Sequence, residues 1–145
     1  MQIFEAIRQD HERQRLLLKI LVETTGASEP RKEYYAALKK ELKQHEVAEE
    51  RHFYVPLMEN DNTIADSRHG IAEHHQIDKL LVKLDETDMS SPVWLKTLKE
   101  LQEKVEHHLA EEEQEFFQKA GKVFSKSEKH ELATEYKAEM EPIRA

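Results

Sequence analysis

The stretch HEVAEERHFY (residues 45–54) and its partial copy HLAEEEQEFF (residues 108–117) decide the fold. Both contain His-x-x-x-Glu-Glu, both carry aromatic residues at +8 and +9 from the histidine, and they lie 63 positions apart. Because positions i and i+4 share one face of an α-helix, each copy presents an imidazole and a carboxylate to the same neighbour. The repeat predicts two helices that contribute to one polar site, and a metal ion is the obvious occupant.

The composition favours long helices around such a site. Of the 145 residues, 36% are Asp, Glu, Lys or Arg. Only 3 Gly and 4 Pro are present, which is too few for the many turns that a fold of short strands needs. We expect a single domain over residues 1–145. The absence of Cys excludes disulfides, thiolate zinc sites and iron–sulfur ligation by this chain. Any metal therefore has only nitrogen and oxygen ligands.

The charge of the chain narrows the classes of partner. A net charge of −8 argues against nucleic acid or an anionic membrane surface, since both need clustered positive charge, and it leaves a cation as a compatible partner. No apolar run approaches the roughly 18 residues of a membrane span. The polar first residues lack the basic-then-apolar pattern of a signal peptide. We expect a cytoplasmic protein with no nucleic-acid partner and no membrane partner.

Punctuation divides the chain into four long helices and a shorter fifth. The first long helix is expected over about residues 2–23, and the second from about Arg31 to Pro56, which should kink or end the helix just before it. The third should start at a cap formed by Asp61 or Asn62 and run to about Leu84. The fourth should run from Pro92 to about Gly121. Short loops make neighbouring helices antiparallel, which predicts an all-α, up-down-up-down four-helix bundle over about residues 2–122. Ser125-x-x-Glu128 has the form of a capping box. It predicts a C-terminal helix over about residues 125–141, with a structural role only.

Two further histidines complete the predicted site. His11 and His74 are also 63 positions apart, and leucines follow each of them at +6, +7 and +10. The chain thus looks like a duplicated helix pair, each half of which supplies two histidines and one glutamate at matched depth. Buried imidazoles and carboxylates on four helices would be costly without mutual pairing or a cation. The predicted metal ligands are His11, His45, Glu49, His74, His108 and Glu112.

Neighbouring residues offer competing assignments. His107 and Glu111 also form His-x-x-x-Glu, but they lack the aligned aromatic residues that the two chosen copies share. Glu50 and Glu113 are rotated about 100° from the chosen glutamates, so we expect them to point sideways or outward. His52 lies two turns beyond the first motif histidine. It either approaches the site or lies partly exposed at the end of the bundle.

On these residues the chain resembles the hemerythrin family, specifically the His-His-Glu (HHE) cation-binding domains. The resemblance covers about residues 3–121 and rests on Asp10-His11, residues 45–50, Glu73-His74 and residues 108–113. It implies a non-haem di-iron centre, with the four histidines as terminal ligands and the two glutamates as bridges between two iron ions. Which pair of histidines serves which iron stays open. Zinc or manganese are expected substitutes, because imidazole and carboxylate ligands suit all three metals.

The resemblance also implies a small diatomic or peroxide ligand. Oxygen-carrying hemerythrins have a further histidine four residues after the first on the third helix, and here that position is Asp78, which could bind metal or orient His74. One imidazole fewer leaves more exchangeable positions, which favours reactivity or sensing over reversible oxygen carriage. The leading hypothesis is a di-iron protein that binds or reacts with O2, peroxide or NO. The alternatives are a cation sensor or storage module without turnover, an oxygen-binding hemerythrin, and a bundle without metal.

Overall fold

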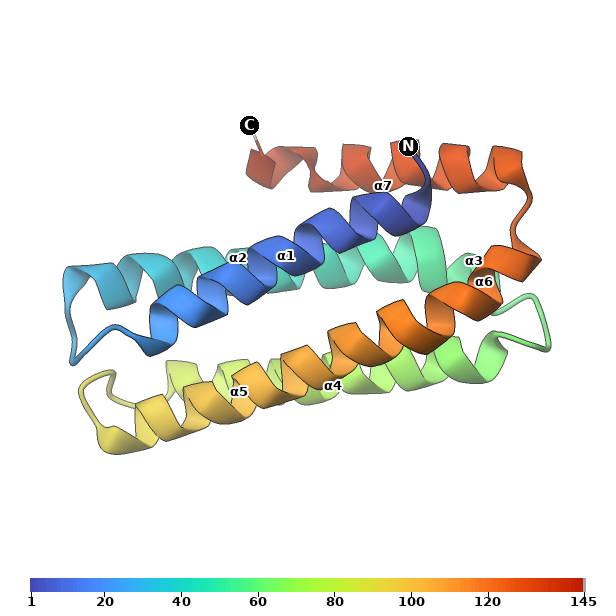
Figure 1. Cartoon of the computed structure of the whole chain (residues 1–145). Coiled ribbons are helices and arrows are strands. Elements are labelled where there is room, and N and C mark those ends of the chain that lie inside the picture. The colour runs from blue at the N-terminus through green and yellow to red at the C-terminus, as the bar shows by residue number, and fades with distance from the viewer. Residues whose placement is uncertain (145) are drawn as a thin grey trace.

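The computed structural model describes residues 1–144, and within that range its regular structure is entirely helical. The long helices are α1 (Ile3–Val22), α2 (Glu29–Glu49), α4 (Ile64–Asp85), α5 (Pro92–Glu111) and α7 (Lys126–Arg144). Two short continuations follow α2, namely η1 (Glu50–Tyr54) and α3 (Val55–Leu57), and two follow α5, namely η2 (Glu112–Phe116) and α6 (Phe117–Val123). Figure 1 shows α1 beside α2, α4 beside α5, and α7 against the α1–α2 pair. The predicted four-helix bundle with an additional C-terminal helix is confirmed.

Local signals account for most of the helix boundaries. Ser91 caps α5 by accepting a hydrogen bond from the Val93 amide at 3.2 Å, with Pro92 at the first helical position, as predicted. Ser125 and Glu128 form the predicted reciprocal capping box before α7, with distances of 2.8 and 3.1 Å. The start of α4 was predicted too early.

Thr63, rather than Asp61 or Asn62, precedes the first residue of α4. Its hydroxyl donates to the carbonyl of Leu57 at 2.7 Å, which holds the turn between α3 and α4 closed. The helix therefore starts where this buried side chain is fixed rather than at the first capping residue in the sequence.

A π-helical turn begins at or directly after the inner glutamate of each motif. The turn η1 begins directly after Glu49, and η2 begins at Glu112 itself. Wider turns of this kind are often found at functional sites, where they change the direction of side chains. Pro56 lies beyond η1, within α3, so the helix continues to Leu57 and does not end just before Pro56. The change in hydrogen bonding instead comes at Glu50.

Two apolar clusters occupy the ends of the bundle and leave a polar layer between them. The cluster around Phe53 and Phe116, whose rings lie 5.1 Å apart, fills the end where α7 packs. The cluster around Leu38 and Trp94 fills the other end. Within residues 1–144, no helix combines the length and the apolar character that crossing a membrane requires.

Helix α7 lies along α1 and α2. Its buried residues are Ala133, Tyr136 and Met140. Arg144 near its end donates to Asp10 at 2.5 Å and to Glu41 at 2.7 and 2.8 Å. The helix is therefore tied to the bundle by both apolar and charged contacts.

Candidate metal centre

The six predicted ligands meet in one buried layer. His11, His45, Glu49 and Glu112 form one group, and Glu49, His74 and His108 form another; within each group, one donor atom per residue lies within 4.8 Å of the others. The most exposed of the six retains only 3% of its accessible surface. Glu49 belongs to both groups, which places it between two adjacent sets of donors.

Each half of the chain supplies the histidines of one group. The rings of His11 and His45 lie 5.3 Å apart, and those of His74 and His108 lie 4.9 Å apart. The two groups are separated by 6.4 Å between the rings of His45 and His74. In the structure, therefore, the ring of His11 lies beside that of His45, and the ring of His74 lies beside that of His108.

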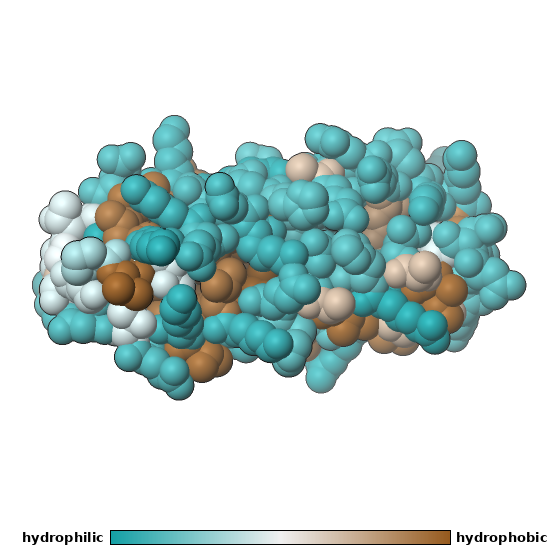
Figure 2. Space-filling view, turned by 90° about the horizontal axis from the view of Figure 1, so that it is seen from below, coloured by the Kyte–Doolittle hydropathy of each residue, from teal (hydrophilic) through white to brown (hydrophobic). Residues whose placement is uncertain are grey.

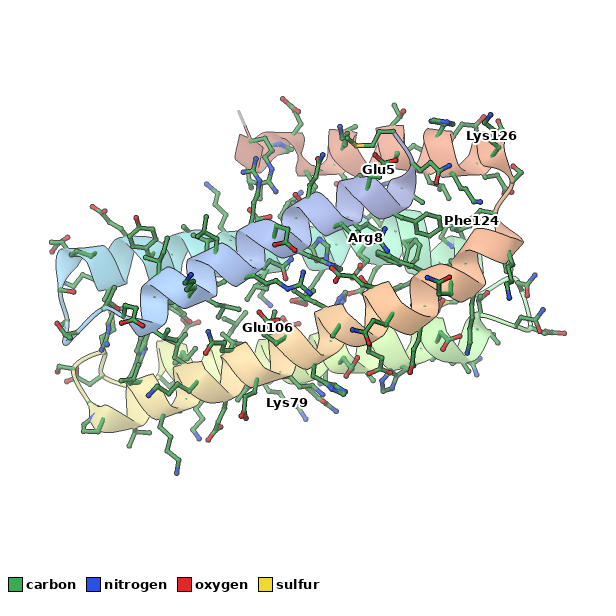
Figure 3. The ribbon with its side chains drawn as sticks, viewed as in Figure 1. Glu5, Arg8, Lys79, Glu106, Phe124 and Lys126 are labelled. Carbon is green, nitrogen blue, oxygen red and sulfur yellow. The ribbon has the colours of Figure 1, made fainter. Side chains whose placement is uncertain are left out.

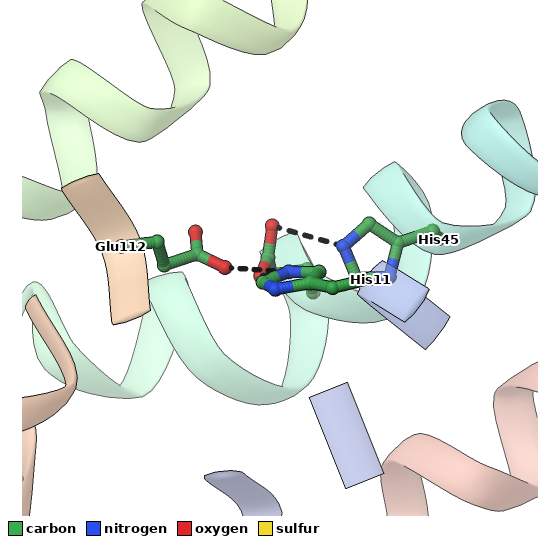
Figure 4. Close-up of side chains that lie close together, drawn as sticks. His11, His45 and Glu112 are labelled. Carbon is green, nitrogen blue, oxygen red and sulfur yellow. Dashed lines mark ion pairs between the residues drawn. The ribbon is translucent and has the colours of Figure 1, made fainter. Parts of the chain in front are cut away.

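Both glutamates face one histidine from each group. Glu49 Oε1 lies 3.4 Å from Nε2 of His45 and 3.0 Å from Nε2 of His74. Glu112 places Oε1 3.1 Å from Nε2 of His11 and Oε2 3.6 Å from Nε2 of His108. In Figure 4, Glu112 approaches from one side and His11 and His45 approach from the other. This is the arrangement that carboxylates bridging two ions would need.

The outer nitrogen of every ring has its own partner. The Nδ1 atom of His11 lies 2.7 Å from Glu113, and that of His74 lies 2.9 Å from Glu50. The Nδ1 atom of His108 lies 2.8 Å from Glu73, and that of His45 lies 2.5 Å from the hydroxyl of Tyr136. Such contacts fix the orientation of a histidine and raise its basicity as a ligand. As a result all four Nε2 atoms point inward.

Glu50 and Glu113 point sideways, as predicted. Each of them meets a ligand histidine on a helix of the other half of the chain. Glu113 lies against His11, and Glu50 lies against His74. Arg15 also donates to Glu113, at 3.0 and 3.1 Å. The second glutamate of each motif therefore supports the site across the halves.

Several inward atoms have no hydrogen-bond partner among the described residues. They are Nε2 of His11, His45 and His74, both carboxylate oxygens of Glu49, and Oε1 of Glu112. His74 Nε2 is near Glu49 but does not meet it in the direction of a hydrogen bond. Because each unpaired buried polar atom costs roughly 1–3 kcal/mol, this convergence is explained best by cations that all of them ligate.

Without a cation, the carboxylates hold protons on three of the imidazoles, those of His11, His74 and His108. Burial lowers the pKa of His11, but its contacts with Glu112 and Glu113 raise it overall to about 9. The same opposition raises the pKa of His74 to about 9 and that of His108 to about 10. Burial raises the pKa of Glu49, but the nearby histidines hold it well below its usual value. A metal ion must therefore displace protons from the histidines.

Comparison with known proteins agrees with this geometry. Residues 2–120 match the family described as the hemerythrin HHE cation binding domain. The chain belongs to this family. A crystal structure of a hemerythrin HHE cation binding domain-containing protein from Mycobacterium kansasii superposes with a TM-score of 0.87 at 26% sequence identity, covering 99% of this chain and 88% of that one. A search of functionally curated proteins found no match. Family membership and the buried donors together support metal binding.

Tyr54, from η1, adds an oxygen to the HHE centre that the sequence analysis missed. Its hydroxyl donates to Glu112 and lies 3.3 Å from Nε2 of His108. Burial and the carboxylates of Glu112 and Glu49 raise its pKa well above the usual value, so the phenol keeps its proton in the metal-free protein. The available signal was the one chemical difference between the aromatic pairs: Tyr54 stands where the second copy has Phe117.

Tyr136 connects α7 to the centre, in contrast to the purely structural role predicted for that helix. Its hydroxyl accepts from Nδ1 of His45 and donates to Asp10 at 2.6 Å. Arg144 holds the other oxygen of Asp10. Helix α7 thereby supplies both a ligand-orienting hydroxyl and a charge that holds the aspartate in place.

The remaining candidates lie outside the buried layer. Asp78 pairs with Lys43 at 3.0 Å. His52 contacts Glu139 at 3.2 Å, and His107 pairs with Glu111 on the surface at 3.1 Å. The 108/112 register is therefore the one that faces the core.

Proposed function

We propose that the buried layer holds two iron ions bridged by Glu49 and Glu112, and that this centre binds or reacts with O2, peroxide or NO. One ion would be held by His11 and His45, the other by His74 and His108. The observation that carries the proposal is the inward convergence of the Nε2 atoms on two shared carboxylates, with every Nδ1 occupied by an outer partner. Iron is consistent with this donor set. When bound, it would supply redox chemistry and positions for a small ligand.

A small cavity beside the centre supports a small ligand rather than an organic substrate. Its volume is about 20 Å³, and its lining includes Gly70, His108, Glu112 and Phe116. A cavity needs roughly 10–15 Å³ to hold one water molecule, so this one accommodates a molecule of about the size of water, dioxygen or peroxide. It reaches the group formed by His74 and His108, on the side where Tyr54 lies.

The protein's own groups divide the work around such a ligand. The outer carboxylates hold the rings in place and balance the charge of the cations. Tyr54 keeps its proton and donates it in a hydrogen bond to Glu112, which lines the cavity. The ring of Phe116 gives the cavity an apolar wall.

The test is the metal content and visible spectrum of protein purified without chelator or His tag. We expect about two irons per chain, a near-ultraviolet absorption shoulder, and a change in that absorption when peroxide or NO is added. The variant His45→Ala/His108→Ala should lose both metal and absorption. The control His75→Ala/His130→Ala removes two histidines that lie outside the layer and should leave both unchanged. A protein with no metal or a single zinc, unaffected by the first variant, would contradict the proposal.

A sensing role without turnover is the second candidate, because Tyr136 links one ligand histidine to α7. Iron binding would then fix α7 more firmly against α1 and α2. The thermal midpoint should rise with iron, and cleavage within α7 by a protease should slow. An unchanged midpoint and cleavage rate in the iron-loaded protein would remove this candidate.

A further inference from the structure

A second cluster of histidine and glutamate lies on the outer face of α4 and α5. His69 Nε2 lies 3.0 Å from Glu111 Oε1 and 3.4 Å from Glu73 Oε1, and one atom of each of the three lies within 4.8 Å of the others. His107 Nε2 holds the second oxygen of Glu111 at 3.1 Å. The side chains of His69 and His107 are 55% and 68% exposed, so solvent ions reach them directly.

We propose that His69, Glu73 and Glu111 bind a divalent transition-metal ion from solvent and pass it to the buried centre. The transfer role rests on the proposed function, whereas the binding role stands without it. A mixed set of imidazole nitrogen and carboxylate oxygen suits ions such as Fe²⁺, Mn²⁺ and Zn²⁺, while Ca²⁺ and Mg²⁺ prefer oxygen alone. The net charge of −8 attracts cations of either class, so the imidazoles provide the selectivity.

Geometry connects this outer cluster to the centre. Glu73 Oε1 lies 3.4 Å from His69 Nε2 on the outside and 2.8 Å from His108 Nδ1 on the inside, so one carboxylate touches both. The small cavity beside the centre is lined by His69 and Glu111 as well as by His108 and Glu112. A hollow of about 500 Å³ bordered by His69, His107 and Glu111 opens outside it. An ion thus has a path lined mostly by polar side chains.

The corresponding face of the other half has no such cluster. A shift of 63 positions places Ala6, Gln44 and Ala48 where His69, His107 and Glu111 stand. Helix α7 covers that face, where the Gln44 amide donates to the carbonyl of Glu139 at 2.5 Å. The face formed by α4 and α5 is open and largely hydrophilic when seen from below (Figure 2). Among the described residues, the ligands therefore occur on the half that α7 leaves accessible.

Counting bound zinc tests the outer site. We expect His69→Ala/Glu111→Gln to bind one zinc ion fewer than the unmodified chain in equilibrium dialysis, whatever number the buried layer holds. The control His75→Ala/Glu103→Ala changes exposed residues of the same types on the same two helices and should bind as many as the unmodified chain. Equal numbers in all three proteins would overturn the site. Thermal midpoints check that each variant is folded.

Anaerobic loading of Fe²⁺ tests the transfer role. Native mass spectrometry at successive times should show the outer-site variant reaching the same buried occupancy at least tenfold more slowly than the control variant. Loading at the same rate would overturn transfer even where the zinc count falls by one. A chain that binds zinc through His69 and Glu111 but takes up no ion in the buried layer would refute the proposed function and leave the outer site standing.

Discussion

The α1–α2 and α4–α5 halves present the same inner residues and different outer ones. At the inner positions, His11 and His74, His45 and His108, and Glu49 and Glu112 correspond. At the outer positions, Asp10 corresponds to Glu73. Glu73 meets its histidine directly at 2.8 Å, but Asp10 is one methylene shorter and contacts His45 only through Tyr136. The inner residues must satisfy one shared geometry, whereas the outer ones need only hold a ring in place, which several side chains can do.

Charged contacts show the same freedom at the outer positions. Arg15 donates to Glu106 at 3.3 Å, and Glu106 projects from α5 toward α1 in Figure 3. The corresponding residues are Asp78 and Lys43, which likewise join the two halves and pair at 3.0 Å with the charges exchanged. An ion pair is kept at this place although its two signs are reversed. Its polarity is therefore not what the fold requires.

Replacing Gly70 should produce the largest effect, because Gly70 makes room for Tyr54, the one residue that differs between the two aromatic pairs. A Cβ at this position would lie 2.5 Å from Cζ of Tyr54, whose side chain is fully buried. The residues that correspond by the 63-residue shift are Ile7, in the first half, for Gly70, and Phe117, in the second half, for Tyr54. We expect Gly70→Ala to lower the free energy of unfolding by about 2–3 kcal/mol through overpacking and to displace the hydroxyl from Glu112. Urea unfolding of the metal-free protein measures the first effect.

Gly121→Ala is the matched control, since Gly121 is also helical and the nearest neighbour of an added Cβ is 4.0 Å away. There the substitution should stabilise the protein by roughly 0.5–1 kcal/mol, because alanine favours the helix. Similar responses at the two glycines would mean that Tyr54 adapts, and that the difference between the halves carries no packing cost.

Removing the Tyr136 hydroxyl should weaken the group formed by His11 and His45 and spare the other group. In Tyr136→Phe the Nδ1 of His45 loses its partner, and we expect roughly a tenfold to hundredfold loss of metal affinity there. Glu73→Gln is the reciprocal variant, since it alters the contact to His108 in the other half. Competition with a chelator during zinc release measures both affinities.

Tyr34→Phe removes a hydroxyl from a partly buried tyrosine remote from the centre and serves as the control. If Tyr136→Phe lowers the metal affinity of both groups equally, the two groups bind metal as one unit. The two halves would then differ in their outer contacts but not in how they bind metal.

The sequence predicted those parts of the molecule that depend on periodic spacing. The four long helices follow from apolar spacing and short loops, and the six inner residues follow from the 63-residue repeat, because equal spacing along helices of equal length gives equal depth. Tyr54 was also within reach, as the sole chemical difference between the two aromatic pairs.

The features that escaped prediction depend on contacts between helices. The turns η1 and η2 differ from α-helix by one residue in hydrogen-bond spacing, for which the residues in those turns give no signal. The contact between Tyr136 and His45 depends on how α7 lies along α1 and α2, and the sequence of α7 alone does not fix that register. Glu50 and Glu113 were placed correctly to the side, but their partners belong to the other half of the chain.

Glu46 gives the smallest expected effect and isolates one more difference, since the corresponding residue of the second half is the buried Leu109. Burial, together with the nearby Asp78, raises the pKa of Glu46 to about 9, so the folded protein holds a proton that the unfolded chain releases above its ordinary pKa of 4.5. The stability that this group contributes is fully present below pH 4.5 and is lost progressively as the pH rises toward 9.

Glu46→Gln keeps the shape of the side chain but removes the titrating proton, and the variant should exceed the unmodified chain in stability by about 1–2 kcal/mol at pH 8. Urea midpoints of the metal-free proteins should coincide at pH 4 and separate as the pH rises, whereas Glu100→Gln, at an exposed position, should show no separation. A pH-independent difference would mean that Glu46 is ionised in the fold, and that the first half tolerates a buried charge where the second has leucine.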